Sequence, residues 1–231
     1  MNRTLVIAAV TRQLMRLAVI VSAAVGVARA ADDGPVDSLE KEVRAFEAQD
    51  RQQPPEAGGV LFLGSSSIRM WDTAKAFPDA RIINRGFGGS QIADSIHFAG
   101  RIAVPYKPRL IVFYAGDNDI AAGKSADEVL SDFKEFVGKI HASLPETHIA
   151  FIAIKPSPMR WKFFETQSRA NDLIRELIKT DRRMSYIDVV KPMLGDDGQP
   201  RHELFKKDHL HLNDEGYRLW NGIVKPVLDE K

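Results

Sequence analysis

Apolar residues along the chain form short runs that alternate with longer amphipathic segments. Each run is almost continuously apolar and is bounded by polar residues or glycine, which is typical of strands buried on both faces of a parallel sheet. The predicted strands are 59–63, 81–84, 109–115, 148–154 and 185–189. Because a parallel sheet must be covered on both faces, the pattern predicts an α/β protein.

The amphipathic segments predict the covering helices. Residues 126–144 carry apolar side chains at the 3.6-residue spacing of a helix face, and Pro145 directly after them cannot continue a helix. Two further helices are predicted at 168–180 and 216–228, and a polar one at 36–49 precedes the first strand. Strands that alternate with helices favour right-handed crossovers and a layered arrangement.

The first thirty residues have a different pattern. Three arginines precede an apolar run, 17–27, which is followed by the small-residue sequence Ala-Arg-Ala at 28–30. These are the three parts of a secretory signal peptide, and the run is shorter than the roughly 20 residues of a membrane span. We therefore expect 1–30 to be removed on export to the periplasm or the medium, with Ala31 near the mature start and Met15 as an alternative initiator.

Composition narrows the classes of function. The chain has 231 residues, 44% of them hydrophobic, so we expect one main domain over 58–231, preceded by a helical extension over 31–57. A net charge of +1, from 32 basic and 31 acidic residues, does not favour a nucleic-acid partner or an anionic membrane. The absence of cysteine excludes thiol catalysis and thiolate metal sites. No oligomeric state is indicated.

Small and polar residues follow the predicted strands. The first strand is followed by Gly-Ser-Ser-Ser (64–67), the second by Arg-Gly-Phe-Gly-Gly-Ser (85–90) and the third by Gly-Asp-Asn-Asp (116–119). Near the end of the chain, residues 208–211 read Asp-His-Leu-His. Ligands of open parallel sheets bind beyond the carboxyl ends of the strands, so we expect these segments to meet at one edge.

Taken in order, the four segments resemble the four sequence blocks of the SGNH (GDSL-like) hydrolase family, and the resemblance extends from about residue 59 to the end. It implies a three-layer α/β/α sandwich with a five-stranded parallel sheet in flavodoxin-like strand order. It also implies hydrolysis of a small-molecule carboxylic ester without a cofactor. The common first block is Gly-Asp-Ser-Leu, from which this chain departs at Ser65 and Ser67.

The resemblance assigns roles to five residues. Ser66 matches the nucleophile, His211 the base and Asp208 the acid that orients it. The oxyanion hole matches the backbone N–H groups of Ser66 and Gly89 and the side-chain amide of Asn118. The chemistry is consistent, because a serine hydroxyl needs a neighbouring base, and a histidine held by a carboxylate supplies one near neutral pH. We expect an acyl-enzyme mechanism.

Residues next to these blocks have weaker indications. Arg160 and Trp161 follow the fourth strand and are candidates for binding an anionic or sugar-like group, with packing of a surface loop as an equal alternative. Asp117 and Asp119 are expected to brace the loop that carries Asn118. His209 is interpreted as a loop residue rather than as a second base.

Three other functions compete with the esterase. Asp208, His209, His211 and Asp214 resemble a metal cluster, but they lack a recognised spacing, so no metal is expected. The glycines of 86–89 lack the dinucleotide fingerprint, which weakens a flavin- or nucleotide-binding function. A catalytically inactive binding module with the same fold is the main alternative, and the complete set of site residues argues against it.

Overall fold

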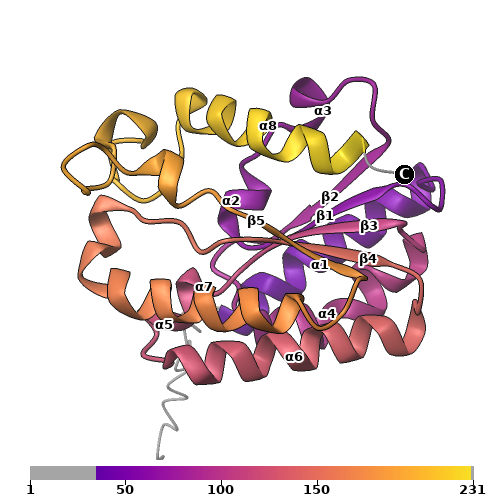
Figure 1. Ribbon diagram of the computed structural model, residues 1–231. Helices are drawn as coiled ribbons and strands as arrows, with labels where there is room; N and C mark the ends of the chain where they lie inside the picture. The colour runs from indigo at the N-terminus through magenta and orange to yellow at the C-terminus, as the bar shows by residue number, and fades with distance from the viewer. Residues whose placement is uncertain (1–34, 230–231) are drawn as a thin grey trace, which may run out of the picture. The chain divides into compact units, whose positions relative to one another are not determined.

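The computed structural model describes residues 35–229, which form one sheet with helices on both of its faces (Figure 1). The predicted signal peptide, 1–30, lies outside the described residues. Among the helices at 35–229, none combines the length and the apolar character needed to cross a membrane.

The sheet has five parallel strands in the order β2-β1-β3-β4-β5. Their bounds are β1 Val60–Gly64, β2 Ile82–Gly86, β3 Leu110–Tyr114, β4 His148–Ile152 and β5 Met184–Ile187. Leu61 of β1 pairs with Ile83 on one side and with Ile111 on the other, so β1 lies between β2 and β3. The predicted α/β/α class and the flavodoxin-like strand order are both confirmed.

Four helices cover one face of the sheet. They are α1 Pro35–Gln52, α4 Ile92–Ile102, α6 Ala126–Ser143 and α7 Phe164–Ile178, seen together below the sheet in Figure 1. The aromatic centre of this layer is formed by Phe113 and Phe151 of the sheet with Phe133 and Phe136 of α6, the rings of Phe113 and Phe136 lying 4.0 Å apart. Full burial of such side chains stabilises the layer by about 1.5–3 kcal/mol each.

The other face is covered by α2 Ser66–Arg69, α3 Thr73–Ala76 and α8 Asp214–Asp229. Trp71 and Trp220 form the centre of this layer, with ring centroids 5.4 Å apart, and Trp71 also packs edge-on against Phe62 of β1. The short helix α5, Asp117–Ala121, follows β3, and 3₁₀ segments occupy Val104–Tyr106, Pro158–Phe163, Lys191–Met193 and His202–Leu204. The C-terminal helix α8 is therefore anchored directly beside the segment that follows β1.

The helices differ from the sequence prediction in three ways. Helix α4 is not among those predicted, although it buries Phe98 and Ile102 at helical spacing. Helix α1, predicted as an extension ahead of the main domain, buries Leu39 and Val43 in the same core as the sheet. The predicted helix at 168–180 begins earlier, at Phe164, because a 3₁₀ turn leads directly into it.

Candidate active site

A sharp turn after β1 brings a serine to the edge of the sheet. Gly64 has a φ of +137°, and a Cβ atom there would lie 1.9 Å from the carbonyl oxygen of Tyr114. Only glycine fits this close approach, which lets the chain pass from β1 into α2 within two residues. Ser65 is the N-cap of α2 and Ser66 is its first residue, beyond the carboxyl end of β1.

The three adjacent serines differ in their surroundings. Ser65 and Ser67 are buried, each with 2% of its surface exposed, whereas Ser66 is partly exposed. The carbonyl of Ser67 accepts a hydrogen bond from the hydroxyl of Tyr217 on α8 at 2.9 Å. Burial leaves Ser66 as the serine of this run that can meet both a base and a substrate.

Ser66, His211 and Asp208 form a hydrogen-bonded chain. Nε2 of His211 lies 3.0 Å from Oγ of Ser66, and Nδ1 lies 2.7 Å from Oδ2 of Asp208. A carboxylate only accepts, so Nδ1 carries the ring proton and the neutral ring presents an unprotonated Nε2 to the serine. This is the arrangement of nucleophile, base and orienting acid that acyl transfer requires.

The loop that carries the acid and the base is fixed by its own backbone. Phe205 and Leu212, both buried, pair as an antiparallel bridge, and the N–H of Lys206 donates to the carbonyl of His211 at 2.8 Å. Oδ1 of Asp208 accepts the N–H groups of Leu210 and His211, each at 3.0 Å. Partial burial opposes ionisation of Asp208, but these bonds and the His211 ring hold its pKa well below the ordinary value.

The loops after β2 and β3 are tied together at the same edge. The side chain of Asn118 donates from Nδ2 to the carbonyl of Ser90 at 2.9 Å. The backbone N–H of Ile92 donates to both carboxylate oxygens of the buried Asp119, at 3.2 and 3.3 Å. Because β1 lies between β2 and β3, these loops flank Ser66, and Gly89 is exposed among them with a φ of +78°.

Beneath Asn118 lies a buried cluster of charged groups. The carboxylate of Asp117 is 3.1 Å from Nζ of Lys155 and 2.9 Å from Nη1 of Arg160, and it accepts from Gln167 at 3.1 Å. Burial opposes the ionisation of Asp117, but the two cations outweigh it and hold its pKa below the ordinary value. Burial, the largest cause, and the negative charge of Asp117 raise the pKa of Tyr114, whose hydroxyl is 3.2 Å from Nζ of Lys155, to about 12.

A sequence model of the GDSL-like lipase/acylhydrolase family matches residues 66–219. The chain belongs to this family. It is therefore a serine hydrolase acting on ester bonds, and the resemblance drawn from the four sequence blocks is confirmed. No curated protein matches the sequence significantly.

Several solved structures share the fold. A Streptococcus pneumonia protein, provisionally described as a platelet activating factor, superposes with a TM-score of 0.76 at 21% identity, over 84% of this chain and 94% of its own. A GDSL-like lipase from Bacteroides thetaiotaomicron gives 0.69 at 17% identity, over 81% and 97%. An acetyl-xylooligosaccharide esterase from Geobacillus gives 0.61 at 12% identity, over 76% and 96%.

Two residues predicted to bind substrate have protein partners in this hydrolase. Arg160 donates from Nη2 to Oδ1 of Asn118 at 2.9 Å, in addition to its ion pair with Asp117. Trp161 is partly buried and stacks on Phe164, with ring centroids 4.3 Å apart. Arg160 thus contacts the segment that carries Asn118, and substrate binding by Arg160 and Trp161 stays a prediction.

Helix α1 contributes a contact that sequence reasoning missed. The carboxylate of Glu42 accepts the backbone N–H of Gly88 at 3.1 Å and pairs with Arg69 of α2 at 3.2 Å. It thereby holds the residue before Gly89 and the helix that begins with Ser66. The sequence offers no local signal for this contact, because Glu42 and Gly88 are 46 positions apart.

Nowhere in the described range, 35–229, do three His, Asp or Glu side chains gather as metal ligands.

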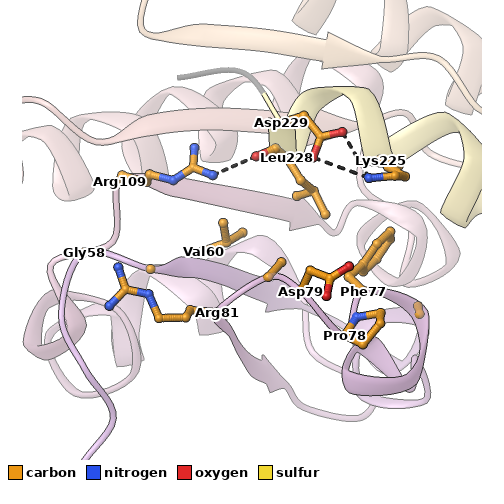
Figure 2. Close-up of a pocket in the computed structure, with 13 residues that line it drawn as sticks. Gly58, Val60, Phe77, Pro78, Asp79, Arg81, Arg109, Lys225, Leu228 and Asp229 are labelled. Atoms are coloured by element: carbon orange, nitrogen blue, oxygen red, sulfur yellow. Dashed lines mark hydrogen bonds and ion pairs between the residues drawn. The ribbon is translucent and has the colours of Figure 1, made fainter.

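A hollow of about 350 Å³ lies at the amino ends of the strands, opposite the edge that carries Ser66 (Figure 2). There Arg109 donates to the carbonyl of Leu228 at 2.7 Å, and Lys225 pairs with Asp229 at 3.1 Å.

Proposed function

We propose that the protein is a serine esterase that hydrolyses carboxylic esters through an acyl-enzyme on Ser66. The observation that carries the proposal is the continuous chain from Asp208 through His211 to Oγ of Ser66, with steps of 2.7 and 3.0 Å. Both distances are within hydrogen-bond reach, which is the geometric requirement for a nucleophile and its base.

In the first half of the reaction, Nε2 of His211 accepts the proton of Ser66 while Oγ attacks the ester carbonyl carbon. The carbonyl oxygen becomes an oxyanion, which accepts hydrogen bonds from the backbone N–H groups of Ser66 and Gly89 and from a side-chain N–H of Asn118. The His211 imidazolium is stabilised by the carboxylate of Asp208. It then gives its proton to the leaving alcohol, and the acyl group remains on Ser66.

In the second half, His211 takes a proton from a water molecule, whose oxygen attacks the acyl carbonyl carbon. The same donors hold the new oxyanion, and its collapse breaks the bond to Oγ, which regains a proton from His211. The products are the carboxylic acid and free Ser66. Each donor to the oxyanion contributes roughly 3 kcal/mol to lowering the barrier.

The proposed substrates are acetylated carbohydrates, lysophospholipids and other short acyl esters. The acetyl-xylooligosaccharide esterase and the lipase that share the fold support this range. Export is part of the proposal and favours extracytoplasmic esters of these kinds. The proposal of export rests on the signal-like sequence pattern of 1–30, which lies outside the described residues.

A fluorophosphonate probe tests the proposal, because it phosphonylates a serine that a neighbouring base activates. Mass spectrometry of the labelled protein is expected to locate the adduct on Ser66, with no adduct in Ser66→Ala and slower labelling in His211→Ala. The variants Ser65→Ala and Ser67→Ala, at buried neighbours of the same run, are the matched controls and should label like wild type.

Two outcomes would contradict the proposal. A folded wild-type protein that takes no adduct and hydrolyses no ester of an acetyl-sugar, lysophospholipid and graded acyl-chain panel would favour the inactive binding module. An adduct on Ser65 or Ser67 would keep the serine-hydrolase class and overturn the choice of nucleophile. The panel also ranks the proposed substrates.

A further inference from the structure

We propose that Arg160 is a positioning residue that aims and polarises the side-chain amide of Asn118 toward the oxyanion. The proposal rests on the proposed function, because it concerns a donor to the same intermediate. It gives Arg160 a different role from the substrate binding that its place after β4 suggests.

The contacts of Asn118 determine how its amide is turned. Nη2 of Arg160 lies 2.9 Å from Oδ1 of Asn118, and Nδ2 lies 2.9 Å from the carbonyl of Ser90. A guanidinium only donates and a backbone carbonyl only accepts, so turning the amide over would lose both bonds. These contacts use one of the two N–H groups on Nδ2, and the other is the donor assigned to the oxyanion.

A cation on the oxygen of an amide also strengthens its N–H groups as donors. Arg160 draws electron density toward Oδ1 of Asn118, which leaves the nitrogen more positive. Hydrogen bonds to charged groups are roughly twice as strong as neutral ones, and linked bonds polarise one another by about 10–30%. Arg160 therefore acts on the oxyanion through Asn118 and without touching substrate.

The position of Arg160 is set by groups beneath it. Its side chain is 16% exposed, and those of Asp117 and Lys155 are 6% and 1% exposed. One carboxylate faces two cations here, so the cluster has a net positive charge beside the place where negative charge develops. Fixed charge of this sign lowers the barrier without reorganising during the reaction.

The same contacts argue against recognition of an anionic substrate by Arg160. Nη1 is buried and 2.9 Å from Oδ1 of Asp117, and one of the two N–H groups of Nη2 donates to Asn118. A substrate anion that took these donors would have to displace a buried carboxylate or the amide itself. Displacing the carboxylate would leave a buried charge without its partner, and displacing the amide would leave a polar group without its hydrogen bond, so both are unfavourable.

A double-mutant cycle with p-nitrophenyl acetate as the probe tests the inference. The variants are Arg160→Met, Asn118→Ala and the double variant, each measured for kcat and KM. We expect Arg160→Met to lower kcat about 10- to 30-fold with KM nearly unchanged, and Asn118→Ala to lower it about 10²-fold. In the Asn118→Ala background, Arg160→Met should cost less than about threefold, because its effect passes through the missing amide.

Three further variants separate the possible causes. Arg160→Gln keeps a donor but removes the charge, and Arg160→Lys keeps the charge, so we expect Arg160→Lys to recover more of kcat. Arg175→Met is the matched control, since Arg175 is a partly exposed arginine paired with Asp172 and Asp188 instead of Asn118, and its kcat should equal that of wild type. Thermal melting of every variant shows whether the fold is retained, and Arg160→Lys and Arg160→Gln serve if Arg160→Met does not fold.

Independent losses in the cycle would overturn the inference, as would a rise in KM that depends on the charge of the substrate. An unchanged kcat in Arg160→Met or Arg160→Gln would overturn it as well. The proposed function fails separately, when wild type neither cleaves p-nitrophenyl acetate nor takes the fluorophosphonate. An active wild type with independent losses therefore removes only the role of Arg160.

Discussion

Oγ of Ser66 lies 3.0 Å from Nε2 of His211, although 145 positions of the chain separate the two residues. The helix α8 brings them together. It begins at Asp214, just after the loop that carries His211. The hydroxyl of its Tyr217 donates to the carbonyl of Ser67, and the side chain of its Asn221 accepts from the indole N–H of Trp71, both in the segment after β1. The contact between nucleophile and base therefore depends on the packing of α8 against α2.

Variants of Ser66 and Ser67 test which serine of the run is the nucleophile. Ser66→Ala is expected to lower kcat by more than about 10³-fold, because the acyl-enzyme cannot form. Ser67→Ala should retain kcat within a few-fold, since Ser67 is buried and a substrate cannot reach it. Steady-state hydrolysis of p-nitrophenyl acetate measures both. Equal losses in the two variants would contradict the assignment.

Asp208 is expected to act through the orientation of His211. Asp208→Asn should lower kcat by about 10³- to 10⁴-fold while leaving KM nearly unchanged, because the amide can favour the wrong ring tautomer. Nitrogen NMR of the histidine ring would show the change directly. Asp214→Asn, at the exposed start of α8, is the control and should leave both readouts as in wild type.

Glu42 is expected to support the oxyanion hole from outside the matched family region. Glu42→Ala removes the acceptor of the Gly88 N–H and the partner of Arg69, so kcat should fall about tenfold. Glu47→Ala, on the same helix and paired with Arg101, should leave kcat unchanged. Equal effects of the two variants would show that Glu42 acts only through the stability of α1.

The buried pair of Asp117 and Lys155 predicts a pH dependence of stability. The lowered pKa of Asp117 means that its ion pairs contribute fully above the unfolded-chain value of about 3.9, and that this contribution is lost as pH falls through the folded value. Asp117→Asn should cost about 3–5 kcal/mol of unfolding free energy at neutral pH, where it leaves Lys155 unpaired. The difference from wild type should stay constant from about pH 7 to 5 and shrink below about pH 4.

Urea unfolding at graded pH measures this difference. Asp172→Asn is the control, because Asp172 is an exposed carboxylate and its replacement should change unfolding little at any pH. A difference between Asp117→Asn and wild type that grows toward acidic pH would contradict the assignment of charge to this cluster.

Export predicts a shortened mature chain. Expression of the full sequence in a bacterial host is expected to give a periplasmic or medium form whose amino terminus, found by sequencing, lies near Ala31. Deletion of 1–30 should keep the protein in the cytoplasm with unchanged esterase activity. An uncleaved chain in the cytoplasm would contradict export.

The sequence by itself determined the fold class and the order of the parts. Continuous apolar runs such as 109–115 and amphipathic segments such as 126–144 are local patterns that depend on burial and spacing, so they predicted strands and helices closely. The four sequence blocks, from the one at Ser66 to the one at His211, likewise identified the family, because their residue types and their order along the chain match it. Helix α4 was missed although its apolar spacing is visible, so that omission is one of interpretation.

Only the tertiary structure decided which neighbours each site residue has. Ser66 is distinguished from Ser65 and Ser67 by exposure, which depends on how α2 packs and not on residue type. Arg160 donates to Asn118, 42 positions away, and Glu42 accepts from Gly88, 46 positions away. Contacts between residues so far apart in the sequence depend on how whole helices and strands pack. A local pattern of polar and apolar residues predicts the elements but not how they pack against one another.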